Sequence, residues 1–278
     1  PPLKHQFIFS KNDYKGFRGL WQFGRMISRI ETFDLFISFP DSFSSALMGM
    51  ATGAVKRIGY KKEGREILLT NAFTKPKGLH RVEEYVRLLE LYTHINRKEL
   101  AVSLSHPFPK KDYVVININS EASSRRLPVE KAVEVIGMAR KQLAEKIVLI
   151  GGPGEKEFVE TVLSKVERKE NIESVAGITS LTGLVEVLAS ARVVLTTDSG
   201  PAHLSNALGT QTVVLFGAGN EANTAPYNKE KVQVIRLGQL SCEPCTKNVC
   251  VRFGTPKCLT LLNTAAIIST VKERSFHD

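Results

Sequence analysis

From Tyr113 onward, short apolar runs alternate with amphipathic runs of helical length, and this alternation restricts the fold more than any other feature of the sequence. Short apolar runs bounded by turn residues are typical of buried strands. Strands that alternate with helices specify a parallel sheet covered on both faces. Residues 113–220 are therefore predicted to form a doubly wound α/β domain. The expected strands are YVVININ, KIVLIGG, IESVAG, RVVLTT and TVVLFG (113–119, 146–152, 172–177, 192–197 and 212–217).

The first hundred residues are predicted to form a separate, smaller α/β unit. After them, the segment 93–112 loses periodicity and carries two prolines, which is typical of a linker. We therefore expect one domain over 1–105 and a second over 106–278. The expected elements of the first domain are strands at HQFIFS and FDLFISF (5–10 and 33–39) and helices at 42–54 and 81–92; a final helix is expected over 262–275.

The charge balance favours acidic partners. Thirty-eight Lys and Arg residues against 28 Asp and Glu give a formal net charge of +10, which suits a phosphorylated substrate or an anionic membrane surface. Aromatic residues do not interleave with the basic ones as they do in RNA-binding sheets, so no nucleic-acid partner is expected. The sequence shows no apolar run long enough to span a membrane and no signal-peptide pattern, and we expect a soluble, cytoplasmic protein.

A polar cluster lies at the seam between the strand 192–197 and the helix predicted over 200–209. Asp198, Ser199 and Gly200 follow the carboxyl end of that strand and precede the helix. Open α/β sheets bind ligands at this edge, and the N–H groups at a helix N-terminus favour an anion. The alternative is that Asp198 or Ser199 only caps the helix.

Two further loops follow strands at the same predicted edge. The loop 119–128 (NSEASSRRLP) offers hydroxyl groups, including Ser120, and the guanidinium of Arg125, which together suit a phosphate. The loop 151–157 (GGPGEKE) offers Glu155, whose carboxylate could accept hydrogen bonds from ribose hydroxyls. Taken singly, each loop is equally typical of a solvated surface loop. Their convergence predicts a nucleotide or sugar-nucleotide site.

The region 176–217, which contains the D-S-G-P-x-H-L core, resembles the signature region of glycosyltransferase family 9, the ADP-heptose:lipopolysaccharide heptosyltransferases. The resemblance extends over nearly the whole chain and is greatest to the heptosyltransferase II branch. It implies a GT-B arrangement of two Rossmann-like domains, with the nucleotide sugar held by the C-terminal one. It also implies that heptose is transferred from ADP-heptose to the lipopolysaccharide inner core, with inversion and without a metal cofactor, at the inner face of the inner membrane. The alternative is a nucleotide-sugar-binding module of the same fold that lacks catalysis.

The resemblance also implies functions for particular residues. Ser120 matches a hydroxyl position near the diphosphate, and Arg125 stands where the family usually has a lysine that contacts phosphate. Glu155 and Thr179 fall near the ribose and the base. The residues that match the nucleotide-diphosphate motif are Asp198, Ser199, Gly200 and His203; the histidine could instead lie against the sheet as a core residue.

The resemblance places the general base outside this sequence. Family members carry an Asp in a Gly-Asp turn after their first strand, and this sequence contains no Gly-Asp dipeptide. The resemblance begins near the third strand of the N-terminal domain, so we expect the base to lie before Pro1, with roughly 60 residues, or two βα units, missing. Asp41, which follows the strand predicted over 33–39, is the substitute within the sequence.

Four cysteines lie close together in the last fifth of the chain. C-x2-C followed by two more cysteines suits tetrahedral zinc, although the second pair lacks the usual spacing. Reduced packing thiols and disulfides are the alternatives, and disulfides are disfavoured in a cytoplasmic protein. The four residues are Cys242, Cys245, Cys250 and Cys258.

Overall fold

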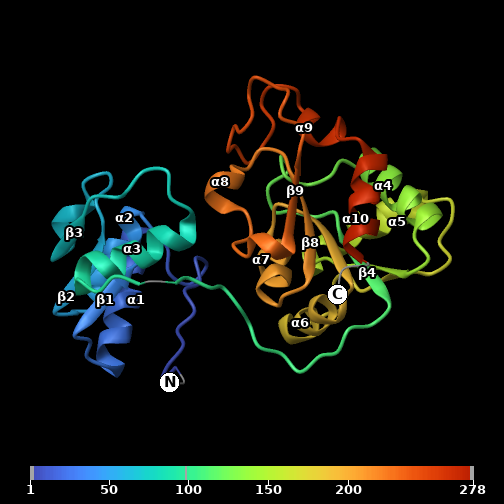
Figure 1. The fold of residues 1–278 in the computed structure, drawn as a ribbon. Helices are drawn as coiled ribbons and strands as arrows, with labels where there is room; N and C mark the ends of the chain where they lie inside the picture. The colour runs from blue at the N-terminus through green and yellow to red at the C-terminus, as the bar shows by residue number, and fades with distance from the viewer. Residues whose placement is uncertain (1–2, 98, 276–278) are drawn as a thin grey trace. The chain divides into compact units, whose positions relative to one another are not determined.

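The chain divides into two compact units, 1–99 and 100–278, each with its own parallel sheet (Figure 1). The structure is a computed structural model that describes residues 3–97 and 99–275. The division falls within the non-periodic segment that the sequence marks as a linker.

The first unit has a three-stranded parallel sheet in the order β1-β2-β3. The helix α1 packs on α2, and α3 packs on β2 and β3. The strands are β1 (Leu35–Ser38), β2 (Lys56–Tyr60) and β3 (Asn71–Phe73), and the helices are α1 (Gly16–Ile30), α2 (Phe43–Ala51), the 3₁₀ helix η1 (Arg65–Leu68) and α3 (Arg81–Thr93).

The strand predicted over 5–10 is wrong, because these residues join no sheet. Phe9 instead packs against the rings of Tyr14 and Phe23, with ring centroids 6.0 and 5.2 Å away. Aromatic residues are frequent in strands because they pack well on a half-buried surface, and here an aromatic cluster at α1 provides that surface. The helix α1 itself and the strands β2 and β3 were not predicted from the sequence.

The second unit contains all five predicted strands and one more, in a six-stranded parallel sheet of order β6-β5-β4-β7-β8-β9. The extra strand, β9, pairs with β8 at the edge of the sheet. The strands are β4 (Tyr113–Asn117), β5 (Lys146–Leu149), β6 (Ile172–Ser174), β7 (Val193–Thr197), β8 (Gln211–Phe216) and β9 (Val232–Arg236).

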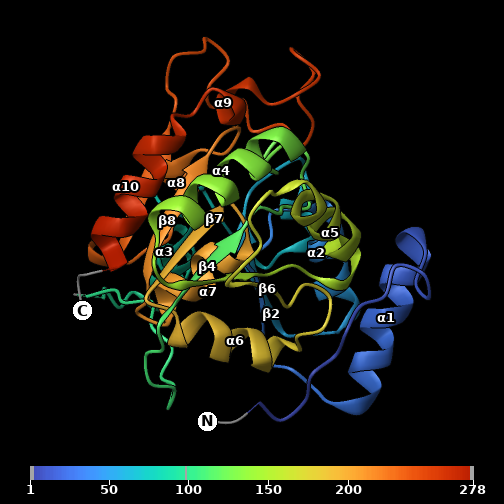
Figure 2. The same cartoon turned by 90° about the vertical axis from the view of Figure 1, so that its right-hand side faces the viewer.

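Helices cover both faces of this sheet (Figures 1 and 2). Successive side chains of β7 point to opposite faces of the sheet. Val193 and Leu195 pack toward α4, α5 and α10, whereas Val194 packs toward α6. The final helix α10 packs on α4, β7 and β8, and its crossing to the first unit stays a prediction. The helices are α4 (Val129–Gln142), η2 (Pro153–Glu155), α5 (Lys156–Lys165), α6 (Leu181–Ser190), α7 (Gly200–Ala207), α8 (Glu221–Thr224), η3 (Lys229–Lys231), α9 (Lys257–Thr260) and α10 (Thr264–Ser275).

The strand order locates a switch point in the second sheet. From β4 the chain proceeds through β5 to β6 on one side, and from β7 it proceeds through β8 to β9 on the other. The carboxyl ends of β4 and β7 are therefore neighbours at the place where the order reverses. Ligands of open α/β sheets bind in the crevice outside such a switch point.

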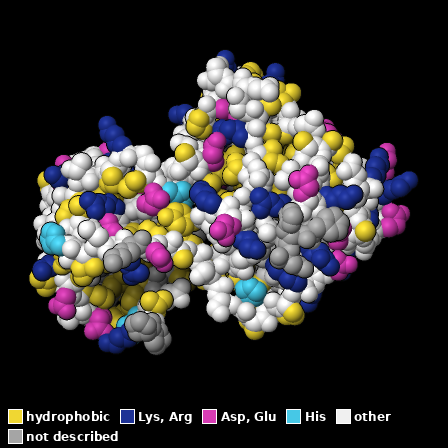
Figure 3. All heavy atoms as spheres, viewed as in Figure 1, with side chains coloured by type: hydrophobic (Ala, Val, Ile, Leu, Met, Phe, Trp, Pro, Cys, Tyr) yellow, Lys and Arg dark blue, Asp and Glu magenta, His cyan; other side chains and the backbone are white. Residues whose placement is uncertain are grey.

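The basic side chains do not gather in a single patch on the face shown in Figure 3, where Lys and Arg are interspersed with Asp and Glu. Over the described part of the chain, no helix combines the length and the apolarity needed to cross a membrane.

Candidate functional site

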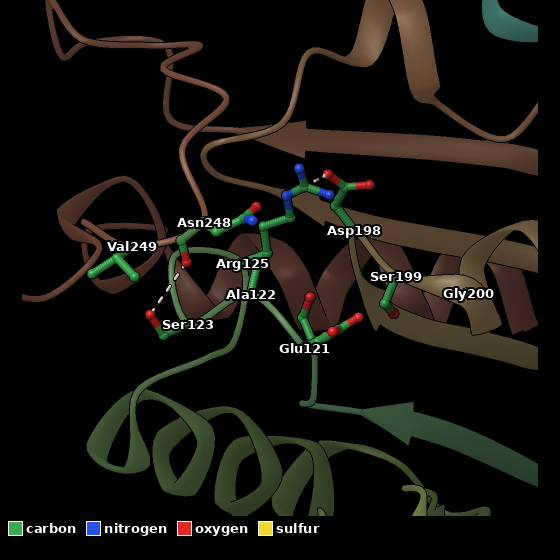
Figure 4. A pocket seen from close by; sticks show the side chains of 10 residues that line it. Glu121, Ala122, Ser123, Arg125, Asp198, Ser199, Gly200, Asn248 and Val249 are labelled. Carbon is green, nitrogen blue, oxygen red and sulfur yellow. Dashed lines mark hydrogen bonds and ion pairs between the residues drawn. The ribbon is translucent and has the colours of Figure 1, made fainter. Parts of the chain in front are cut away.

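Two cavities adjoin at the switch point, and both are lined by the loops that follow β4 and β7. The first has a volume of about 500 Å³ and is drawn in Figure 4. The second, of about 330 Å³, extends toward the loops that follow β5 and β6. Four residues line both cavities and so mark their junction: Ser120, Glu121, Ser199 and Gly200.

Buried amides at the end of β4 join the loops that follow β4, β5 and β7. The Asn117 side-chain amide donates to the hydroxyls of Thr196 and Ser199, at 3.0 and 2.9 Å. The Asn119 amide donates to the carbonyl of Ile150 at 2.9 Å. The Oδ1 atom of Asn119 is buried and has no hydrogen-bond partner among the described residues, although Asn119 lines the second cavity. An orphaned buried acceptor of this kind is unfavourable, and folded proteins keep few of them.

The amino terminus of α7 carries no side-chain cap. Ser199 occupies the N-cap position, but its hydroxyl donates backward to the carbonyl of Thr197 at 3.1 Å. The capping alternative therefore does not hold for Ser199. Gly200, the first residue of the helix, lines both cavities. The positive end of the helix dipole thus lies beside the junction, where it favours an anion.

Asp198 has a buried carboxylate with few interactions to offset the cost of its burial. It is 4% exposed, and its Oδ2 atom has no hydrogen-bond partner among the described residues. Burial raises the pKa of Asp198, whereas the charges of Arg125 and His203 act in the opposite direction. The chain passes so close that a Cβ on Gly219 would lie 2.0 Å from Oδ2, so only glycine fits there without rearrangement.

The adjacent residues Arg125 and Arg126, in the loop after β4, make different contacts. Arg125 lines the first cavity, and its Nε lies 3.6 Å from Oδ2 of Asp198 (Figure 4). That separation is longer than a hydrogen bond, so the guanidinium keeps donors for another partner. Arg126 instead donates to the carbonyl of Ser120 at 3.1 Å and lies over the ring of Phe158. Arg126 thus fixes the loop, and Arg125 faces the cavity.

The second cavity combines polar groups with an apolar lining. Glu155 accepts a hydrogen bond from the backbone N–H of Gly152 at 2.8 Å, which fixes its carboxylate at the cavity. Thr179 lines the same cavity. The apolar part of the lining consists of Ile150, Leu181, Leu184 and Pro201. Apolar walls with a few fixed polar groups are typical of small-molecule sites.

Seven of the eight predicted binding residues line one or both cavities; His203, one turn into α7, does not. Their function in binding stays a prediction. Several lining residues were not predicted from the sequence. The two asparagines at the end of β4 could have been found from their position at a strand terminus. Nothing in the sequence indicates that the segment containing Asn248 and Val249 reaches the first cavity.

The structure gives no support to the predicted zinc site, because the described residues include no group of three or more His, Cys, Asp or Glu side chains placed to hold a metal ion. Zinc binding by the four cysteines stays a prediction. All four cysteines are free thiols. Cys258 is buried, and a Cβ on Gly217 would lie 3.1 Å from its sulfur. Burial raises the pKa of Cys258 to about 11. Hydrogen bonds to neighbouring loops fix the cysteine segment.

Asp41, the substitute for the general base, lies in the first unit between β1 and α2. Its Oδ2 atom lies 2.7 Å from Nζ of Lys75, and the same ammonium lies 3.1 Å from Oε2 of Glu84. The carboxylate of Asp41 is thus held in an ion pair. Its function as a base stays a prediction.

Comparison with known proteins identifies the family. Residues 21–254 match the model of Glycosyltransferase family 9 (heptosyltransferase). The chain belongs to this family. The expected α/β class with parallel, Rossmann-like sheets is confirmed, because solved heptosyltransferases share the fold.

Individual members of the family are similar at low identity. The chain is 24% identical over 236 residues to the lipopolysaccharide core heptosyltransferase OpsX of Haemophilus influenzae, covering 78% of this chain and 65% of that protein. It is 23% identical over 253 residues to lipooligosaccharide heptosyltransferase 2 of Campylobacter jejuni, covering 87% and 76%. The structure of E. coli ADP-heptose lps heptosyltransferase II superimposes with a TM-score of 0.70 at 21% identity, over 92% of this chain and 80% of that one.

Proposed function

We propose that this chain transfers heptose from ADP-heptose to the lipopolysaccharide inner core. Membership of the heptosyltransferase family supports the reaction class. The observation that carries the proposal is the junction of two cavities at the switch point, with an uncapped helix N-terminus and the guanidinium of Arg125 beside it. A diphosphate is the group that such a junction suits best.

The two cavities suggest how the donor lies. The adenosine occupies the second cavity, where Glu155 and Thr179 are within reach of ribose and base and Asn119 offers its unpartnered acceptor. The diphosphate lies at the junction, against Ser120 and the first turn of α7. The sugar then lies in the first cavity, beyond Arg125.

The chemistry that we propose is a single displacement with inversion and without a metal cofactor. The acceptor hydroxyl oxygen forms a bond to the anomeric carbon as the bond from that carbon to the β-phosphate oxygen breaks, and a base takes the hydroxyl proton. Arg125 and the α7 dipole stabilise the charge that develops on the departing ADP. Asp41 is the candidate base within the sequence.

The net positive charge of the chain suits the proposed acceptor. Lipopolysaccharide inner core is anionic and is carried on a membrane lipid, so a chain with a net charge of +10 is attracted to that surface. We propose peripheral attachment at the inner face of the inner membrane.

A transfer assay with ADP-heptose and an inner-core acceptor tests the proposal. Transfer of heptose, with loss of activity in Arg125→Ala, is the expected result. Binding of ADP-heptose without transfer would instead support the alternative, a nucleotide-sugar-binding module of the same fold. Absence of both binding and transfer would contradict the proposed function.

A further inference from the structure

We infer that Asn248 is a specificity-determining residue that contacts the sugar of the bound donor, an inference that rests on the proposed function. Asn248 and Val249 line the first cavity but not the second. They belong to the cysteine segment, here defined as residues 242–258, which is more than a hundred residues away in sequence from the loop after β4. None of the binding residues predicted from the sequence lies in this segment.

The cysteine segment is fastened to the loop that carries Arg125. The backbone N–H of Ser124 donates to the carbonyl of Asn248 at 3.1 Å, and the Ser124 hydroxyl donates to the carbonyl of Lys247 at 2.5 Å. The hydroxyl of Ser123 also donates to the carbonyl of Asn248, at 3.3 Å (Figure 4). Ser124 is 1% exposed, whereas the contact from Ser123 lies at the surface. They use backbone carbonyls and leave the Asn248 side chain for the cavity.

The other side of the segment is fastened to the loop after β8. The N–H of Thr246 donates to the carbonyl of Ala218 at 2.8 Å. The carboxylate of Glu243, whose side chain is 4% exposed, lies 3.5 Å from the guanidinium of Arg236. That loop is the one that passes Asp198 at Gly219. The backbone of Asn248 is therefore held between two loops of the nucleotide site, which fixes the point from which its side chain extends.

The chemistry of the side chain suits a sugar. A carboxamide both donates and accepts hydrogen bonds, as a hydroxyl group does. The Asn248 amide is exposed and makes no hydrogen bond within the described residues, and it lies beside Arg125, on the side away from Ser199 and Gly200 (Figure 4). Val249, 57% exposed, offers apolar surface next to it. If the diphosphate lies at the junction, the group that reaches Asn248 is the sugar.

The test compares ADP with ADP-heptose by calorimetric titration of the full chain. Asn248→Ala should leave the Kd for ADP within about twofold of the wild-type value and raise the Kd for ADP-heptose about tenfold, because one or two hydrogen bonds to the sugar are lost. Val251→Ala is the matched control, since Val251 lies in the same segment, is 82% exposed and does not line the cavity; it should change neither Kd. The Tm of Asn248→Ala should equal that of the wild type, because Asn248 contacts the loop only through its backbone.

Three results would overturn the inference. An unchanged Kd for ADP-heptose in Asn248→Ala would show that the amide does not contact the sugar. An equal loss of affinity for ADP and for ADP-heptose would assign Asn248 to the diphosphate or to the shape of the site. Failure of the wild-type chain to bind either nucleotide would contradict the proposed function itself, and that outcome is distinct from the other two.

Discussion

The charged residues at the carboxyl edges of the two parallel sheets are paired at different distances. In the first unit they are paired with each other: Glu84 lies 2.7 Å from Arg81 and 3.1 Å from Lys75. In the second unit the Asp198–Arg125 separation is 3.6 Å, and the closest oxygen of Asp198 has no hydrogen-bond partner among the described residues. Both edges are rich in charge, but the ion pairs of the first edge are shorter. Oε2 of Glu84, like Oδ2 of Asp198, makes no hydrogen bond among the described residues.

We infer that the charges at the edge of the first unit stabilise the fold, whereas those at the edge of the second unit bind a ligand. A buried polar group without a partner is unfavourable, so folded proteins keep few of them. In the first unit, Arg65 and Glu84 each carry one such atom. Around the adjoining cavities of the second unit there are three, on Asp198, Arg125 and Asn119. We infer that a bound donor completes this set, whereas the ion pairs of the first unit stabilise the loops after its strands.

The largest expected effect concerns stability in the first unit. Glu84→Gln removes the charge that two cations share, and we expect the free energy of unfolding to fall by about 2 kcal/mol, less than for a fully buried pair because Lys75 and Arg81 are partly exposed. Urea unfolding measures the change. Glu66→Gln, an exposed acid of the same unit, is the control and should change it by less than about 0.5 kcal/mol. Equal stability of wild type and Glu84→Gln would show that the ion pairs of Glu84 do not stabilise the first unit.

The same chemical change at Asp198 should have the opposite sign. Burial raises the pKa of Asp198 from its ordinary value of 3.8, so the folded state disfavours the carboxylate. The protonated carboxyl therefore contributes stability to the protein at low pH, and this contribution is lost as the pH rises through the folded-state pKa. Asp198→Asn should therefore be more stable than the wild type at pH 8, by on the order of 1 kcal/mol. The gain should shrink as the pH falls toward 3.8. Thermal unfolding at several pH values measures it, and a destabilised variant at pH 8 would contradict the account.

The sequence predicted the second unit well because its signals are local. The apolar run ending at Thr197, with Pro201 and Gly209 bounding the next helix, marks a strand–helix seam that the structure contains in β7 and α7. The switch point then follows from strand order, which brings the loops after β4 and β7 together. Burial of the seam residues on both faces of the sheet left little freedom for another arrangement.

The errors arose where contacts between distant segments decide the structure. The run 5–10 has strand-like composition, but packing of Phe9 against α1 prevails over that preference. The strand β2 (KRIGY) begins with two basic residues and gives no clear apolar run. The hydrogen bonds from Ser123 and Ser124 that fix the cysteine segment join positions more than a hundred residues apart, so the cysteine spacing gives no sign of them.

The smallest expected effect compares two hydroxyls, one at each edge. Ser42 accepts a hydrogen bond from the N–H of Ser45 as the N-cap of α2, so Ser42→Ala should lower the free energy of unfolding by about 1 kcal/mol. Ser120 lines both cavities of the second unit, so Ser120→Ala should keep its stability and weaken ADP binding about fivefold. Thermal unfolding and ADP titration of both variants measure the contrast. A loss of stability in Ser120→Ala without a loss of affinity for ADP would show that both hydroxyls stabilise the fold.

Titration of ADP into the wild-type chain, Arg125→Ala and Arg125→Lys tests whether the switch-point edge of the second unit holds the donor diphosphate. The wild type should bind ADP, and Arg125→Ala should bind it about 10- to 100-fold more weakly, through loss of a charge-assisted hydrogen bond to phosphate. Arg125→Lys keeps the charge and should stay within about fivefold of the wild type. Wild-type affinity for ADP in Arg125→Ala would contradict the account.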